Sequence, residues 1–173
     1  MIGMPLMIRV FGLVIFGMVL SGLVASSGTA QTGWLFGKEK LGVVMTAQDA
    51  HERAMAGQVV LVDVRSSAEW RKSGVPASGF AITMHQDPRV FTEQLNAAMG
   101  GDKSRPLALI CATGVRTTYL QEALKKLGFS KPINVTEGMM GGRYGDGWIK
   151  RGLPVRSWSK SGDLKPTLGP GAL

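Results

Sequence analysis

The chain has 173 residues, of which 45% are hydrophobic and 18% are charged, and its formal net charge is +8. This length and composition are typical of a globular chain that buries a substantial core. The positive residues are scattered and form no basic block, which argues against a nucleic-acid-binding arm and indicates only a mild attraction for anions.

Residues 1–30 have the layout of a secretory signal peptide. Arg9 precedes an uncharged apolar stretch over residues 10–25, and Gly28 and Ala30 place small side chains just before a cut after Ala30. We therefore predict export, with the periplasm as the destination. The alternative is an uncleaved anchor, although the stretch is short for a membrane span and is interrupted by glycines. Membrane contact is expected only through this segment.

The remaining chain alternates between helical and strand patterns. Thr46 and Asp49 mark the start of a helix that ends near Gly57. "VVLVDV" at 59–64 is a continuous β-branched run, typical of a strand covered on both faces. A short helical turn around Glu69 and a short strand near residues 81–83 follow.

The second half repeats the alternation. Asp87 and Pro88 begin a helix that ends at Gly100, and "LALIC" at 107–111 is a second buried strand. The next helix carries an apolar face and ends at Gly128, before a strand at 133–135. The predicted residues of that face are Leu120, Ala123, Leu124 and Leu127. Trp148 is expected to anchor the glycine-rich segment that follows.

This order predicts an α/β fold, in which a parallel sheet has helices on both faces. We place one domain at residues 38–158 and a flexible C-terminal tail at residues 159–173. Such a sheet binds ligands just beyond the carboxyl ends of its strands.

Cys111, the only cysteine in the chain, ends a predicted strand at that edge. It is either a buried bystander or a free thiol kept for its chemistry. The short loop from Ala112 to Arg116 can turn its backbone N–H groups inward as an anion-binding nest, and the following helix adds its positive N-terminal end. Both features favour a thiolate. Gly114 lets the loop curl tightly, and Arg116 can add a cation beside the pocket.

These motifs resemble the single-domain rhodanese, or sulfurtransferase, family. The resemblance rests on "LVDVRSSAEW" at 61–70, "LICATGVRTT" at 109–118, "NVTEGMMGG" at 134–142 and "GWIKRGLPV" at 147–155. It implies a three-layer fold with a five-stranded parallel sheet, and sulfur transfer without a metal or organic cofactor. The cysteine of this family accepts a sulfane sulfur from a donor such as thiosulfate and passes it to a thiol or cyanide.

Carried over residue by residue, the resemblance makes Cys111 the site of the persulfide. The cradle would be formed by Ala112, Thr113, Gly114, Val115 and Arg116. Arg65 of the D-x-R motif would either edge the pocket or pair with Glu69, and we favour the pair.

Two positions depart from the family pattern. Gly74 stands where a histidine is usual, which predicts altered loop packing rather than lost chemistry. Ala112 stands where many thiosulfate-preferring members carry a cation, which makes thiosulfate less certain as the natural donor. The two histidines carry less weight: His51 is expected at the surface, and His85 as an incidental residue rather than at the pocket rim.

Two other functions stay open. A rhodanese-like sulfur carrier or protein-binding module, in which Cys111 docks a protein acceptor, agrees with the same residues. An oxyanion phosphatase agrees less well, because its loop needs five residues between cysteine and arginine. Here four separate Cys111 from Arg116, and Thr117 occupies the required arginine position.

Overall fold

The computed structural model describes residues 42–159 and 165–167, which lie in a compact unit spanning Lys38–Leu173. The predicted signal segment, residues 1–30, lies outside the described residues. No helix in the described ranges is long and apolar enough to cross a membrane.

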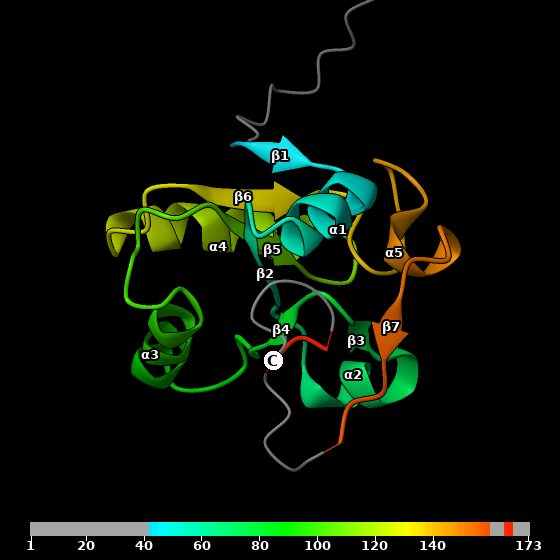
Figure 1. Cartoon of the computed structure of the whole chain (residues 1–173), viewed down its shortest axis with the longest axis horizontal. Helices are drawn as coiled ribbons and strands as arrows, with labels where there is room; N and C mark the ends of the chain where they lie inside the picture. The colour runs from blue at the N-terminus through cyan, green and yellow to red at the C-terminus, as the bar shows by residue number, and fades with distance from the viewer. Residues whose placement is uncertain (1–41, 160–164, 168–173) are drawn as a thin grey trace, which may run out of the picture. The chain divides into compact units, whose positions relative to one another are not determined.

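The middle layer is a five-stranded sheet with the order β1-β6-β5-β2-β4 and parallel pairing throughout (Figure 1). This confirms the predicted α/β fold with a five-stranded parallel sheet. β3 and β7 form a separate antiparallel pair. The strands are β1 (Val44–Met45), β2 (Val60–Asp63), β3 (Val75–Pro76), β4 (Phe80–Ala81), β5 (Leu107–Ile110), β6 (Pro132–Val135) and β7 (Val155–Arg156).

Helices cover both faces of the sheet. β2 and β5 are buried over their whole length, so successive side chains contribute to cores on opposite faces. α3 and α4 supply apolar residues to the core that contains Val62 and Leu109, whereas α1 and α5 supply the core that contains Leu61 and Ile110. The helices are α1 (Ala47–Met55), α2 (Ser67–Ser73), α3 (Pro88–Ala98), α4 (Val115–Lys126) and α5 (Gly147–Lys150).

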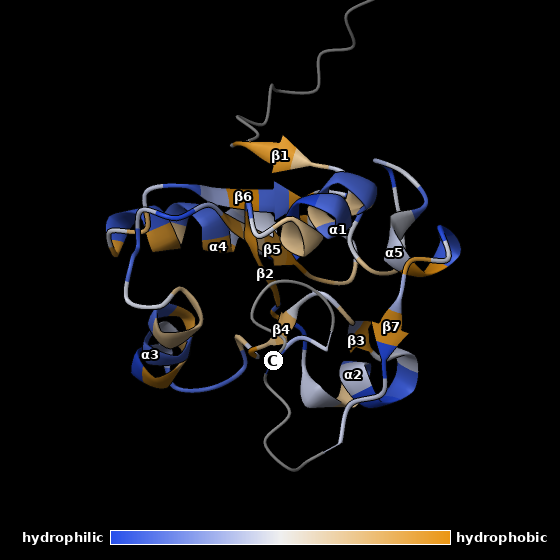
Figure 2. Ribbon diagram, in the orientation of Figure 1, coloured by the Kyte–Doolittle hydropathy of each residue, from blue (hydrophilic) through white to orange (hydrophobic). Residues whose placement is uncertain are grey.

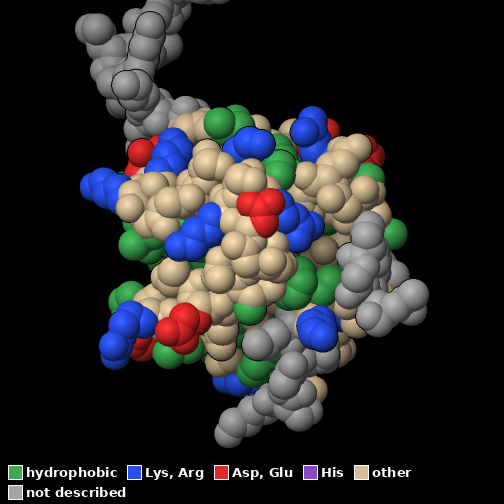
Figure 3. Space-filling view, turned by 60° about the vertical axis from the view of Figure 1, so that its left-hand side comes forward, with side chains coloured by type: hydrophobic (Ala, Val, Ile, Leu, Met, Phe, Trp, Pro, Cys, Tyr) green, Lys and Arg blue, Asp and Glu red, His purple; other side chains and the backbone are tan. Residues whose placement is uncertain are grey.

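Side-chain caps start α1 and α3 where the sequence predicts. The Thr46 hydroxyl accepts the Asp49 N–H at 3.0 Å, and the Asp87 carboxylate accepts the Arg89 N–H at 2.8 Å. Each bond satisfies a donor that has no partner within its helix. Figure 2 shows a hydrophobic β1, a largely hydrophilic visible part of β6, and both hydrophobic and hydrophilic residues on α1, α3 and α4. Positive side chains are scattered over the face shown in Figure 3.

Several details differ from the sequence-based predictions. Leu127 is 51% exposed and Ala123 is also exposed, so α4 buries Leu124 but not these two members of its predicted apolar face. His51 is half-buried rather than at the surface, because its Nδ1 lies 3.0 Å from the Ser78 hydroxyl and its ring contacts the buried Trp148 edge-on. The predicted role of Trp148 as a packing anchor is confirmed, since it is fully buried.

Part of the predicted flexible tail is attached to the domain. The Thr167 N–H donates to the Ala77 carbonyl at 2.8 Å, and Pro166 is buried. Lys165 also lines a small cavity beside Phe80. Within the flexible tail predicted for residues 159–173, a buried proline and a backbone hydrogen bond therefore attach residues 165–167 to the domain.

Candidate functional site

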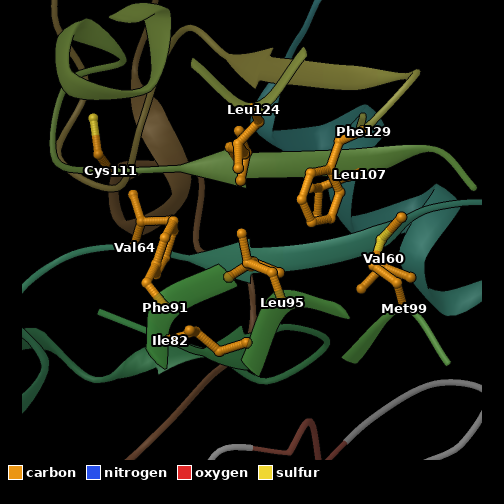
Figure 4. Packing of buried hydrophobic residues seen from close by; sticks show 12 residues of the cluster. Val60, Val64, Ile82, Phe91, Leu95, Met99, Leu107, Cys111, Leu124 and Phe129 are labelled. Atoms are coloured by element: carbon orange, nitrogen blue, oxygen red, sulfur yellow. The ribbon is translucent and has the colours of Figure 1, made fainter. Parts of the chain in front are cut away.

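Cys111 lies immediately after β5, at the carboxyl edge of the sheet. Its side chain is 1% exposed, and Figure 4 shows its sulfur directed away from Val64 and Phe91. The neighbouring strand residues of β5 form the core. The cysteine therefore sits at the boundary between a rigid apolar layer and the loop that follows.

The loop is held by close backbone contacts with residues 136–140. The carbonyls of Cys111 and Ala112 accept the N–H groups of Met139 and Met140, each at 2.8 Å. Gly114 caps α4 with a φ of 81°, and a Cβ there would overlap the Thr136 carbonyl. Glycine, which has no Cβ, allows both the positive φ at position 114 and the close approach of the Thr136 carbonyl to its Cα.

This conformation leaves a row of donors unpaired. Within the part of the chain that the structure describes, the backbone N–H groups of residues 112–116 donate no hydrogen bond to another protein group. α4 begins at Val115, so the positive end of its dipole lies at the same place. Such a row of N–H groups beside a cysteine can stabilise a thiolate or a bound anion.

A buried polar network supports the sulfur from α4 and β6. The Thr117 hydroxyl lies 3.5 Å from the Cys111 sulfur and 2.6 Å from Asn134 Oδ1. Because a hydroxyl has one proton, donation to Asn134, or to the Gly114 carbonyl at 3.0 Å, leaves the Thr117 oxygen to accept from the protonated thiol. Asn134 Nδ2 in turn donates to the Gly114 carbonyl at 3.0 Å. The network therefore fixes both the sulfur and the N-cap of α4.

Arg116 is part of a charged cluster with Glu69 and His85. Its guanidinium binds the Glu69 carboxylate in a bidentate pair, with N–O distances of 2.5 and 3.0 Å. Its Nη1 also lies 3.2 Å from His85 Nε2. The pair holds the pKa of Glu69 at about 2 and raises the pKa of Arg116 further. His85 thus contacts a predicted site residue, contrary to the prediction that it is incidental.

Arg65 has a structural environment. Its side chain is 1% exposed and pairs with the fully buried Asp63 at 2.7 Å. It also donates to the Ser73 hydroxyl at 2.8 Å and to the Gly74 carbonyl at 2.7 Å. The predicted Arg65–Glu69 pair is wrong, because Glu69 caps α2 and binds Arg116 instead. Arg65 therefore connects β2 with the end of α2 through these hydrogen bonds, and it does not line a pocket at the cysteine.

Gly74 fits the structural role expected for this position. It ends α2 with a φ of 71°, and a Cβ would lie 2.7 Å from the Arg156 carbonyl oxygen. A side chain there would push apart the β3–β7 pair. The departure from the usual histidine is therefore accommodated in the local packing.

The structure places the loop residues 112–116 next to Cys111 and pairs the Arg116 side chain with Glu69. Sequence reasoning missed the supporting roles of three residues. Asn134 carried a usable signal, since an amide in the middle of a buried strand requires hydrogen-bond partners. Thr117 and Glu69 carried weaker signals, because their partners are distant in sequence. In the described ranges no His, Cys, Asp and Glu side chains gather in a group that could hold a metal ion.

The loop geometry predicts a large difference between two glycines of similar φ. Gly101 has a φ of 82°, and a Cβ added there would have nothing within 4 Å, whereas a Cβ on Gly114 would meet the Thr136 backbone. We expect Gly101→Ala to cost about 1–2 kcal/mol from the left-handed conformation alone. Gly114→Ala should cost about 1–3 kcal/mol more, because overpacking adds to it. Urea unfolding measures both, and equal costs would contradict the close contact.

The Arg116–Glu69 pair predicts a pH-dependent contribution to stability. The Glu69 pKa is about 2 in the folded chain and 4.5 in its ordinary state. The pair therefore stabilises the fold fully above pH 4.5, and this stabilisation is lost as the pH falls from 4.5 towards 2. We expect Glu69→Gln to lower the urea midpoint at pH 7 but to have little effect near pH 2.5. A deficit of the same size at both pH values would show that the variant acts through packing alone.

Comparison with known proteins agrees with this arrangement. The model of the rhodanese-like domain family matches residues 46–143, which is more than half of the chain. The chain is also 22% identical over 98 residues to the uncharacterized protein RP600 of Rickettsia prowazekii, covering 54% of this chain and 80% of that protein.

Solved structures show the same fold. The polysulfide-sulfur transferase homodimer of Wolinella succinogenes matches with a TM-score of 0.52 and 24% identity, covering 69% of this chain and 82% of that one. A rhodanese-like domain from Anabaena matches with a TM-score of 0.53 and 17% identity, covering 70% and 83% of the two chains. Because the family model matches more than half of its length, and because its fold agrees with these structures, this chain belongs to the rhodanese-like domain family.

Proposed function

We propose that the protein is a sulfurtransferase that moves a sulfane sulfur from an anionic donor to a thiol or cyanide through a persulfide on Cys111. One observation carries the proposal: in the described part of the chain, the cysteine is followed by five backbone N–H groups with no protein acceptor, at the N-terminus of α4. These donors suit the negative charge of a thiolate, a persulfide or a bound donor. The family membership and the Wolinella transferase of similar fold support it.

With thiosulfate as donor, the Cys111 thiolate attacks the outer sulfur. The sulfur–sulfur bond of the donor breaks, and sulfite leaves with the electron pair. Cyanide or an acceptor thiolate then attacks the terminal sulfur of the persulfide, and Cys111 leaves as a thiolate. The cysteine returns to its starting state, so no external oxidant or reductant is needed.

Donor recognition rests on the backbone amides more than on side-chain charge. Ala112 adds no cation, and the Arg116 guanidinium is already neutralised by Glu69. We therefore expect weaker discrimination for thiosulfate than a loop with a free cation would give.

Steady-state turnover tests the proposal against the sulfur-carrier alternative. The full chain is incubated with thiosulfate or polysulfide and cyanide, and thiocyanate is measured over time. Many turnovers per chain support the transferase. One sulfur per chain and no further product would favour a carrier that delivers sulfur to a protein acceptor. Export of the mature chain to the periplasm remains a proposal, tested by N-terminal sequencing of the secreted protein.

A further inference from the structure

His85 lies on the segment between β4 and α3, and its exposed ring faces the arginine of the cysteine loop. Its Nε2 is 3.2 Å from the Nη1 atom of Arg116. Two hydrogen bonds hold this segment in place. The His85 N–H donates to the Thr83 hydroxyl at 3.1 Å, and the Met84 N–H donates to the Val64 carbonyl at 3.0 Å, just after β2. The histidine is therefore fixed at the same carboxyl edge of the sheet as the cysteine.

The chemistry of the two groups sets the direction of this contact. A guanidinium carries only N–H donors, so the histidine nitrogen that faces it has to accept. In this contact the His85 ring is therefore neutral, with its proton on Nδ1. Protonation turns Nε2 into a donor and places two cations side by side. Two converging N–H donors of positive charge form a binding site for an anion, because the anion satisfies both donors and offsets their repulsion.

The other charges of this cluster keep their state near neutral pH. Arg116 of α4 is compensated by Glu69 of α2, whose pKa of about 2 keeps its carboxylate ionised well below neutral pH. On the histidine's own segment, Asp87 and Arg89 lie 3.8 Å apart and carry opposite charges. Protonation of His85 therefore changes the charge of its cluster with Arg116 and Glu69 from zero to one positive charge.

This added charge arises beside the candidate donor site. Hydrogen bonding to Glu69 is the main cause of the raised Arg116 pKa, and the charge of Cys111 contributes to the same rise. The Arg116 guanidinium therefore lies within electrostatic reach of the sulfur. Its backbone N–H also belongs to the row of donors over residues 112–116. An anion held by that row lies next to Arg116, and through it next to the histidine.

We propose that His85 determines the specificity for anionic donors. Its protonated ring and the Arg116 guanidinium together bind the anionic end of the donor, so the preference for a strongly anionic donor such as thiosulfate rises as the pH falls. The inference rests on the proposed function and adds one residue and a pH dependence to donor binding. Above the range in which the histidine titrates, its neutral ring occupies an Arg116 donor and the clamp has no second cation.

Calorimetry of thiosulfate binding to the full chain with Cys111→Ala tests this role. The substitution removes the nucleophile, so the donor binds without reacting, and it also removes the titration of the thiol. We expect thiosulfate to bind about tenfold more tightly at about pH 5.5 than at about pH 8, the gain of one charge-assisted contact. Thiosulfate keeps its negative charge over this range, so the change reports the protein.

Single replacements in the same background identify the group that titrates, because the chain has only two histidines, His51 and His85. With His85→Gln, binding should be equally weak at both pH values. His51→Gln is the matched control and should keep the tenfold change, because His51 lies against Ser78 instead. His85→Lys should bind thiosulfate tightly at both pH values, since lysine keeps its charge throughout this range. A purely structural histidine would not be replaced by lysine in this way.

The outcomes separate this inference from the proposed function. A pH dependence that survives His85→Gln, or that disappears with His51→Gln, overturns the role of His85. Equal binding of thiosulfate at both pH values, or binding at neither, overturns it as well. Sulfur loading of the native chain is measured separately by mass. A chain that loads without this pH dependence keeps the proposed function and loses the histidine. A chain that shows the pH dependence but never loads keeps the anion site and loses the sulfur transfer.

Discussion

Cys111→Ala should reduce the formation of thiocyanate from thiosulfate and cyanide to background, a loss of at least about 10³-fold. The reaction as proposed has two covalent steps, and both use the Cys111 sulfur. The amide row of residues 112–116 remains in the variant, and it can still bind the donor. Binding without a nucleophile produces no turnover, so this substitution has the largest expected effect on activity.

The same substitution should leave the fold almost unchanged. The Thr117 hydroxyl keeps its hydrogen bond to Asn134 at 2.6 Å when the sulfur is removed. Its buried O–H donor therefore still has an acceptor. Circular dichroism and the urea midpoint check the fold of the variant. Turnover that survives in Cys111→Ala would remove the cysteine from the reaction, whereas an unfolded variant would make Cys111→Ser the informative replacement.

Arg65→Met should cost about 3–5 kcal/mol of unfolding free energy, the largest expected effect on stability. Arg65 and Asp63 are 1% and 0% exposed, and the substitution leaves the carboxylate buried without its partner. Burial already raises the pKa of Asp63, and the hydrogen bonds and charge of Arg65 oppose that rise. Without Arg65, only the smaller effect of Trp70 still opposes the rise in the Asp63 pKa. The deficit should therefore be large at pH 7 and smaller below about pH 3.8, where Asp63 is protonated in both states.

Arg116→Met is the matched control for this prediction. It makes the same replacement in the Arg116–Glu69 pair, whose side chains are 30% and 32% exposed. Water screens that pair, so its loss should cost only about 0–1 kcal/mol. Urea unfolding of the two variants at pH 7 gives the comparison. Equal costs would contradict the assignment of Arg65 as the buried structural arginine.

The long elements were predictable from the sequence because each carries several concordant signals. β2 and β5 are continuous apolar runs, and α3 has both an N-cap at Asp87 and an exit glycine at Gly100. β1, β3 and β7 were not predicted, since two residues show no periodicity. Their existence depends on partners that lie far along the chain, such as the pairing of Val44 with Asn134.

The sequence was sufficient to predict the cysteine loop of the site, but not the charged pairs around it. Cys111 and its loop form one continuous segment, so composition and spacing were sufficient to find them. The partner of Arg65 was predicted wrongly. Residues four apart, such as Arg65 and Glu69, contact each other when both lie in one helix, but Arg65 lies outside α2. Arg65 follows Asp63 at the end of a strand, which leaves the two side chains free to pair. Glu69, at the start of α2, binds Arg116 of α4 instead.

The most direct test of the central claim is the intact mass of the full chain after treatment with thiosulfate or polysulfide, with Cys111→Ala alongside. The account predicts that the native chain gains the mass of one sulfur atom, that cyanide removes it, and that the variant gains nothing. A native chain that gains no sulfur from either donor, or a variant that gains as much as the native chain, would contradict the assignment of Cys111 as the persulfide-forming residue.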